Sequence, residues 1–291
     1  MADRPNASRP PGSPSVFMRW ASLLFMHWPC DPEMLKSLIP ESLKLDTFEG
    51  QAWVGLVPFT MKIRHRFVPV IPTARDFLEC NVRTYVVREG DPGAGVPGAG
   101  RPGAGVWFFS LDAQSKLAVI AARKAWQLNY VHSRMSLESR EDGTIHYEVK
   151  RVRRPEVGMK CVWKPGDFVQ GRQDLPSLSG AERGRGKVEQ EDSGGLPIAQ
   201  GSPIASPSPQ PSLSRAREKN LAHFLTERYA LYSCDLKTKR YVGRGRIWHE
   251  PWPLRQAEVL ELDENLIKAA GIELDTTNPP LAWHVDAIDV E

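Results

Sequence analysis

Hydrophobic and polar residues alternate with a period of two along much of the chain, which is the pattern of β-strands packed on a core. The clearest case is the stretch ECNVRTYVVRE at residues 79–89. Its alternating positions define two strand faces, the first with Cys80, Val82, Thr84 and Val86 and the second with Asn81, Arg83, Tyr85 and Val87. Comparable runs along the chain predict roughly ten strands. Two pairs of them are predicted hairpins, with turns at residues 49–51 and at Asp142-Gly143.

Helical signals are few and short. Asp31 followed by Pro32 predicts a helix start, because Asp caps free N–H groups and proline suits the first helical position. Gly271 ends a second short helix. A third helix follows a predicted strand at residues 106–111, and we expect Asp112 to be its N-cap. Few helices favour an antiparallel sheet, because parallel strands need crossover helices.

Three segments show no hydrophobic period. Residues 1–15 are predicted to be a disordered tail, and the Pro-Gly-Ala-Gly repeats at 92–105 an expanded hairpin loop. From about residue 164 to 217, Gly, Ser, Pro and charged residues dominate, so this segment cannot bury enough apolar surface to offset its ordering entropy. It is either a linker between domains or a disordered insertion in one. Strands on both sides favour a single domain over residues 16–291, interrupted by the insertion.

Composition excludes several classes of function. The chain is 41% hydrophobic and 25% charged, and its formal net charge of +3 is too balanced to indicate a nucleic-acid partner. No apolar run reaches the roughly 18 residues of a membrane helix, so we expect no membrane association. The four cysteines are far apart in the sequence and form no Cys-x-x-Cys pair. This favours a reducing compartment, the cytoplasm, over a disulfide framework.

No motif indicates a cofactor or a metal. The seven histidines show neither His-x-His nor His-Glu-x-x-His spacing. The run GRGR at 243–246 falls on a predicted strand rather than before a helix, which argues against a nucleotide site. We therefore expect neither a cofactor nor a metal ion.

Five stretches, in this order, resemble the YqjF-like family of uncharacterised proteins. They are ECNVRTYV at 79–86, FFSLDA at 108–113, LAVIAARKAWQLNYVHSRM at 117–135, FLTERYALY at 224–232 and HEPWPLRQAEV at 249–259. The similarity covers about residues 17–163 and 218–290 and leaves out the tail and the insertion. It implies a single domain.

That family is more distantly similar to acetoacetate decarboxylase, which implies the fold class: mainly β (α+β), an antiparallel β cone or barrel around a central cavity, with a few short helices. The decarboxylases carry a strand glutamate, an arginine and a Phe-Pro-Lys-Lys stretch whose first lysine forms a Schiff base. Here Glu79 matches the glutamate and Arg123 the arginine. The lysine pair is replaced by Tyr130-Val131, so decarboxylation through an imine is not implied.

Lys124 is the lysine that could substitute for the missing pair. It lies about six positions too early, on the apolar side of the predicted helix and four residues after Ile120. Two interpretations compete: a nucleophilic amine turned inward, or a surface lysine whose stem packs while its ammonium reaches water. We favour the surface lysine, because it needs no special partner.

Arginines are the main candidates for binding a ligand. We expect the fold to bring together Arg83, Arg123 and Arg134, and a partly buried guanidinium needs an anion. Either protein carboxylates pair with them and fix the fold, or they bind the carboxylate of a ligand. Glu79 is a candidate acid or base, and Tyr130, at the position of the family nucleophile, a candidate donor to an oxyanion.

His249 is a further candidate binding residue, because it stands at a strand end before a Pro-Trp-Pro turn. A structural histidine explains that position as well. The candidate catalytic set is therefore Glu79, Tyr130 and Lys124, and the candidate binding set is Arg83, Arg123, Arg134 and His249.

Three functions remain open from the sequence. The leading one is a cytoplasmic protein that binds a small carboxylate or carbonyl compound in a central cavity. The second is a lyase or hydrolase that acts on a keto acid without imine formation. The third is a non-catalytic scaffold or partner-binding protein, in which the arginines form internal ion pairs. Whether the chain forms a homo-oligomer is left open.

Overall fold

The computed structural model describes Arg9 and residues 12–66, 76–91, 103–169, 215–235, 238 and 240–291. The predicted tail and the Pro-Gly-Ala-Gly loop lie largely outside these residues, and so do residues 170–214 of the predicted insertion. Strand β8 (Gly158–Phe168) and helix α4 (Arg215–Thr226) extend into the range expected for the insertion. Residues 164–168 and 215–217 therefore belong to regular elements.

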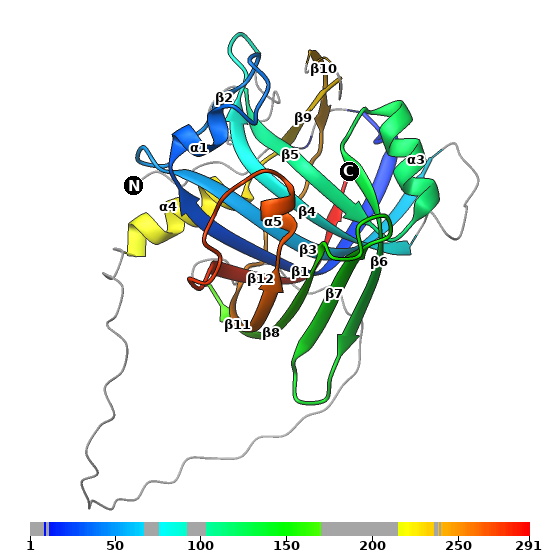
Figure 1. Ribbon diagram of the computed structural model, residues 1–291, viewed down its shortest axis with the longest axis vertical. Helices are drawn as coiled ribbons and strands as arrows, with labels where there is room; N and C mark the ends of the chain where they lie inside the picture. The colour runs from blue at the N-terminus through cyan, green and yellow to red at the C-terminus, as the bar shows by residue number, and fades with distance from the viewer. Residues whose placement is uncertain are drawn as a thin grey trace, which may run out of the picture.

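Nine strands close into a barrel, in the order β5-β6-β7-β8-β11-β12-β1-β3-β4, with β4 pairing back to β5 (Figure 1). Besides β8, they are β1 (Val16–Cys30), β3 (Ala52–His65), β4 (Asp76–Val87), β5 (Ala104–Ala113), β6 (Tyr130–Ser139), β7 (Ile145–Arg151), β11 (Arg255–Glu264) and β12 (Leu281–Val290). All neighbours are antiparallel except β5 and β6. The predicted antiparallel barrel is confirmed.

Three short strands extend the barrel wall. Strand β2 (Lys44–Leu45) pairs with β4, and β9 (Ala230–Cys234) pairs in parallel with β5 and antiparallel with β10 (Tyr241–Arg246). The four described helices are α1 (Pro32–Lys36), α3 (Lys116–Ala125), α4 and α5 (Leu266–Ala269). Within the described residues, no helix is long and apolar enough to cross a membrane.

Two hydrophobic clusters lie on opposite faces of the barrel wall. The inner cluster takes residues from every barrel strand and includes Tyr147 and Trp163, which are fully buried. The outer cluster covers only one side of the barrel, mainly β1, β3, β4, β5 and β12, and is completed by α3, α4 and the segment around Trp252. Large side chains such as Tyr147 and Trp163 thus pack in the described interior, and Glu79, Tyr130 and Arg83 belong to the outer layer.

Strand β1 shows why its apolar run LLFM was continuous in the sequence. Leu24 and Met26 belong to the inner cluster, whereas Leu23 and Phe25 belong to the outer one. A strand that is covered on both faces carries no polar alternation. The register shift between Ala21 and Met26 bends the strand at this point.

The turn and cap predictions are confirmed at four sites and wrong at one. The turn at 49–51 is closed by the Phe48–Gln51 bridge, with Gly50 at a φ of 82°, although β2 before it pairs with β4 and not with β3. Asp31 caps α1, Gly143 adopts a positive φ of 81° in its hairpin turn, and Gly271 follows α5 with a φ of 87°. Asp112 is not the cap of α3, because β5 continues to Ala113 and the Ser115 hydroxyl accepts the capping hydrogen bond from Ala118 N–H.

Candidate functional site

Glu79 and Tyr130 meet across strand β5. Glu79 on β4 lies opposite Ala113 of β5, and Tyr130 begins β6 on the other side of β5. The Tyr130 hydroxyl donates to Glu79 Oε2 at 2.9 Å. Two strands that flank a third are about 9.5 Å apart, a gap that these two long side chains span over the methyl group of Ala113. The sequence named both residues as candidates but did not predict their contact.

Burial makes the Glu79 carboxyl an unusually weak acid. Removal from water raises the pKa of its carboxyl to about 8, and the negative charge of Asp112 adds to the rise, while the Tyr130 hydrogen bond partly opposes it. Burial and the neighbouring Glu79 also raise the pKa of Tyr130 well above its usual value. At neutral pH both groups therefore carry their protons. Oε2 of Glu79 accepts the hydrogen bond from Tyr130, so the Glu79 proton resides on the other carboxyl oxygen, which can donate it.

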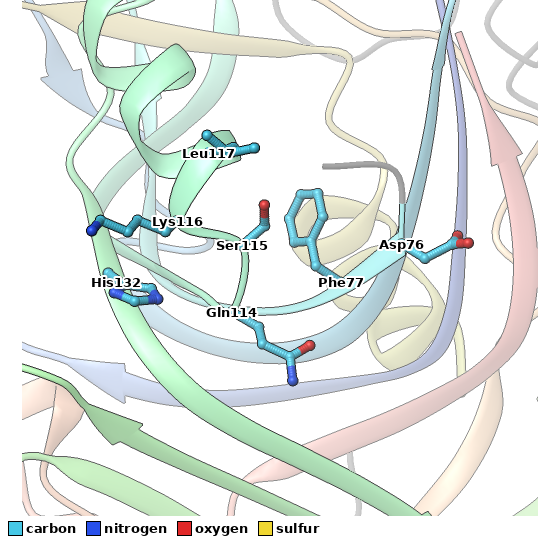
Figure 2. A pocket seen from close by; sticks show the side chains of 7 residues that line it. All are labelled: Asp76, Phe77, Gln114, Ser115, Lys116, Leu117 and His132. Carbon is cyan, nitrogen blue, oxygen red and sulfur yellow. The ribbon is translucent and has the colours of Figure 1, made fainter. Parts of the chain in front are cut away.

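A pocket of about 380 Å³ is lined by residues two positions from this pair along β4 and β6, and neither Glu79 nor Tyr130 is part of its lining. Its lining comes from the start of β4, the β5–α3 turn, the first residues of α3, and β6: Asp76, Phe77, Gln114, Ser115, Lys116, Leu117 and His132 (Figure 2). Phe77 precedes Glu79 by two residues and His132 follows Tyr130 by two, so each shares a strand face with its neighbour. The Glu79–Tyr130 pair thus lies one register step beyond the pocket lining.

Tyr147 fixes the backbone under this site. Its hydroxyl reaches through the barrel interior from β7 and shares its one proton between the carbonyl oxygens of Glu79 and Phe59, at 2.9 and 3.1 Å. The ring is fully buried and part of the inner cluster. The position of Glu79 is therefore coupled to the packing of the far wall.

An ion pair on the opposite side of the wall keeps a negative charge near Glu79. Arg151 donates from Nε to Asp112 Oδ1 at 2.9 Å and from Nη2 to Oδ2 at 2.8 Å, and Ser133 Oγ donates to Oδ1 at 2.7 Å. Such a bidentate pair matches the planar guanidinium to both carboxylate oxygens. Sequence reasoning missed Arg151, which stood in the basic run KRVRR with no sign that the fold buries it.

A second polar cluster, formed by His27, Arg83 and Tyr85, lies in the outer layer beneath α4. The Tyr85 hydroxyl donates to the Leu225 carbonyl at 2.8 Å, so its 2.6 Å contact with His27 Nε2 has His27 as the donor. Burial lowers the pKa of His27 well below its usual value, and Arg83 adds to that effect. His27 is therefore neutral and protonated on Nε2. Sequence reasoning did not single it out.

Three of the stretches that carried the family resemblance meet at this second cluster. Arg83 and Tyr85 come from the first stretch, and Leu225 comes from the fourth. Trp252, from the fifth, packs edge-on against the ring of Phe25. The Arg83 guanidinium lies over the same Phe25 ring, 5.2 Å from its centre.

The candidate binding residues do not converge as expected. Arg123 and Arg134 are exposed, whereas Arg83 is buried beneath α4. His249 is buried as well, stacked on Tyr229 with ring centres 4.6 Å apart and with Nδ1 2.8 Å from the Glu250 carbonyl oxygen. Arg123 lies on helix α3 and Arg134 on strand β6, and residues next to each other on a helix or a strand point in different directions. Membership of a motif therefore did not predict which arginines are buried together.

Lys124 is exposed on α3. We expect no covalent adduct at Lys124 when the protein is reduced with borohydride in the presence of acetoacetate or pyruvate, because the side chain is exposed and is not part of the pocket lining that would hold a carbonyl group against it. Intact mass and peptide mapping measure this directly. A reduced adduct that maps to Lys124 would contradict the assignment of this residue to the surface.

Metal chemistry finds no support in the side chains. Among the described residues, no group of three or more His, Cys, Asp or Glu side chains is arranged to hold a metal ion. The four cysteines are buried free thiols.

Comparisons with known proteins identify the family. Residues 17–289 match the model of a family described as "uncharacterized conserved protein", DUF2071. The chain belongs to this family. It is 33% identical over 280 residues to the uncharacterized protein YqjF of Bacillus subtilis (strain 168), a match that covers 96% of this chain and 90% of YqjF.

Solved structures share the fold at low sequence identity. The enduracididine biosynthesis enzyme MppR, in complex with pyruvate, superposes with a TM-score of 0.52 at 8% identity, over 96% of this chain and 89% of MppR. Acetoacetate decarboxylase from Legionella pneumophila gives a TM-score of 0.49 at 10% identity, over 97% of this chain and 88% of the other. The fold class inferred from the resemblance is confirmed.

Proposed function

We propose that this chain is a cytoplasmic protein that binds a small carbonyl or carboxylate compound in the pocket beside Glu79 and Tyr130, without imine formation. The observation that carries the proposal is the buried Glu79 carboxyl, which keeps its proton at neutral pH and accepts a hydrogen bond from Tyr130, two residues along each strand from the pocket-lining residues Phe77 and His132. Perturbed acids of this kind concentrate at functional sites. The pyruvate in the MppR structure supports the same class of ligand.

The chemistry of the site suits an oxygen acceptor. A protonated carboxyl donates a hydrogen bond to a carbonyl or carboxylate oxygen, as an ionised glutamate cannot. Lys116 and His132, which line the pocket, supply positive or donor groups at its edge, and Phe77 supplies apolar surface. If turnover follows binding, Glu79 is the general acid, because its pKa lies close to neutral pH.

Binding is expected to weaken as the pH rises through the pKa of Glu79. With a pKa of about 8, the carboxyl is almost fully protonated at about pH 6 and roughly one-tenth protonated at about pH 9, so affinity for pyruvate or acetoacetate should fall about tenfold. Titration calorimetry at both pH values measures this change.

Two variants sharpen that test. Glu79→Gln keeps a neutral donor and should bind with no such pH dependence. Tyr130→Phe removes a hydrogen bond that lowers the pKa of Glu79, so the midpoint of the pH dependence should move upward. Arg123→Met, at an exposed position, is the matched control. Binding that is absent at both pH values, or equal in the Glu79→Gln variant and the unaltered protein at every pH, would refute the proposal.

A scaffold without a ligand is the second candidate, and one observation favours it. Two of the buried arginines, Arg151 and Arg228, are paired with protein carboxylates, as expected for ion pairs that fix a fold. Arg83 does not follow this pattern.

A further inference from the structure

Arg83 differs from the other buried arginines of the described chain. Arg83 is 8% exposed, and Arg151 and Arg228 are each 7% exposed. Arg151 is paired with Asp112 at 2.8 Å and Arg228 with Asp46 at 2.7 Å. Within the described residues, no carboxylate forms an ion pair with Arg83. A buried charge without a counter-charge is costly, so the absence calls for an explanation.

The hydrogen bonds of Arg83 leave most of its donors unused. Nη2 donates to the Leu225 carbonyl at 3.2 Å and lies 3.4 Å from the Tyr85 hydroxyl, which are both neutral acceptors. Nε is buried and has no partner among the described residues. The guanidinium also lies over the rings of Phe25 and Tyr85, at 5.2 and 5.7 Å. Ring contacts of this kind offset only part of the cost of burying a cation.

The facing strand supplies another unused donor, and a glycine on it lets the Arg83 side chain pack closely against its backbone. Gly55 lies opposite Arg83 on β3, and a Cβ atom there would come within 3.2 Å of His27 and 3.3 Å of the Arg83 side chain. Trp53 precedes Gly55 by two residues on the same strand face, which makes it a diagonal neighbour of Arg83. The indole N–H of Trp53 is buried and has no partner among the described residues.

This cluster is separate from the Glu79 pocket. Arg83 follows Glu79 by four residues along β4, a rise of about 13 Å, and its guanidinium extends toward Tyr85, away from Glu79. Asp112 is the charge that acts on the Glu79 carboxyl, and Arg83 is not.

We infer that Arg83 is the anchor of a second site, which binds a small oxyanion between the outer face of β3 and β4 and the C-terminal turn of α4. The ligand is a carboxylate or a phosphate, because the planar guanidinium matches both and the indole N–H of Trp53 supplies a further donor. His27 beside Arg83 is neutral and adds no charge of its own. The site goes beyond the proposed function and does not depend on it.

The test is a titration of the full chain with acetate and, separately, with inorganic phosphate, at constant ionic strength. The readout is the ¹⁵N–¹H resonance of Arg83 Nε, assigned by its loss in Arg83→Met. We expect a saturable shift of this resonance with one of the two anions, and the two arms distinguish a carboxylate site from a phosphate site. An unchanged resonance with both anions would overturn the inference.

Thermal unfolding provides a second readout. The anion that binds should raise the melting temperature of the unaltered protein saturably, and Arg83→Met should weaken this effect at least about tenfold. Arg83→Met should fold, because an apolar side chain of similar length replaces an unpaired buried charge. Trp53→Phe should weaken binding about fivefold.

The controls separate this site from the first one. Arg123→Met, at an exposed position, and Glu79→Gln should both keep the full anion response. An equal response in Arg83→Met and in the unaltered protein would show that the anions act elsewhere, at the first site or through general exclusion from the surface, and would overturn the inference.

Discussion

Arg151→Met should lower the free energy of unfolding by about 3–5 kcal/mol, because it leaves Asp112 as an unpaired charge in the barrel wall. Asp112 is fully buried, and both of its oxygens accept from Arg151 at 2.8–2.9 Å. Ser133 supplies one more hydrogen bond, which does not replace the lost charge. Denaturant unfolding followed by circular dichroism measures the loss.

Two further variants show whether the unpaired charge is the cause. The double variant Asp112→Asn with Arg151→Met removes both charges and should lose less stability than Arg151→Met alone. Arg154→Met, three residues away, breaks an exposed pair with Glu156 and should change stability by no more than about 0.5 kcal/mol. A loss below about 1 kcal/mol for Arg151→Met would contradict a tightly coupled buried pair.

Glu79→Gln should stabilise the protein at high pH and should do so progressively less as the pH falls. In the folded chain the pKa of Glu79 is about 8, compared with an ordinary value of 4.5. Between these two values the folded state holds a proton that the unfolded state has released, so the stability of the unaltered protein declines as the pH rises. The slope is about 1.4 kcal/mol per pH unit, and a few kcal/mol in total is expected.

The Gln variant lacks this titration. The difference in unfolding free energy between Glu79→Gln and the unaltered protein should therefore grow from about pH 5 to about pH 8 and then level off. Urea unfolding at several pH values measures it. Glu138→Gln, at an exposed position of β6, is the matched control and should show no such trend. A difference that does not change with pH would contradict a raised pKa.

The sequence was sufficient to predict strand β4 and the residues on each of its faces, but not to predict that both faces are buried. Period-two alternation assigned Cys80, Val82 and Val86 to one face, and these residues belong to the inner cluster. The opposite face, with Asn81, Arg83 and Tyr85, is buried too, because α4 and the Trp252 segment cover it. Helix α4 was not predicted, since it directly follows a segment without hydrophobic period and its own apolar residues are few.

The candidate site was only partly predictable for a similar reason. The family resemblance gave Glu79 and Tyr130, but their hydrogen bond depends on two strands that both flank β5, and strand order is not a local property of the sequence. The expected grouping of Arg83 with Arg123 and Arg134 assumed an open central cavity on which all three converge. In the structure the interior is occupied by aromatic residues such as Trp163, and Arg123 lies on the exposed side of α3.

The most direct test of the central claim is a ¹³C NMR titration of the Glu79 carboxyl in the full chain, with its signal assigned by comparison with Glu79→Gln. The account predicts a carboxyl that remains protonated at neutral pH and titrates with a pKa of about 8. It also predicts that pyruvate, added below that pH, shifts the signal. A carboxyl that titrates near the ordinary value of 4.5 would contradict the account, because an ionised Glu79 could not donate a hydrogen bond to a ligand oxygen.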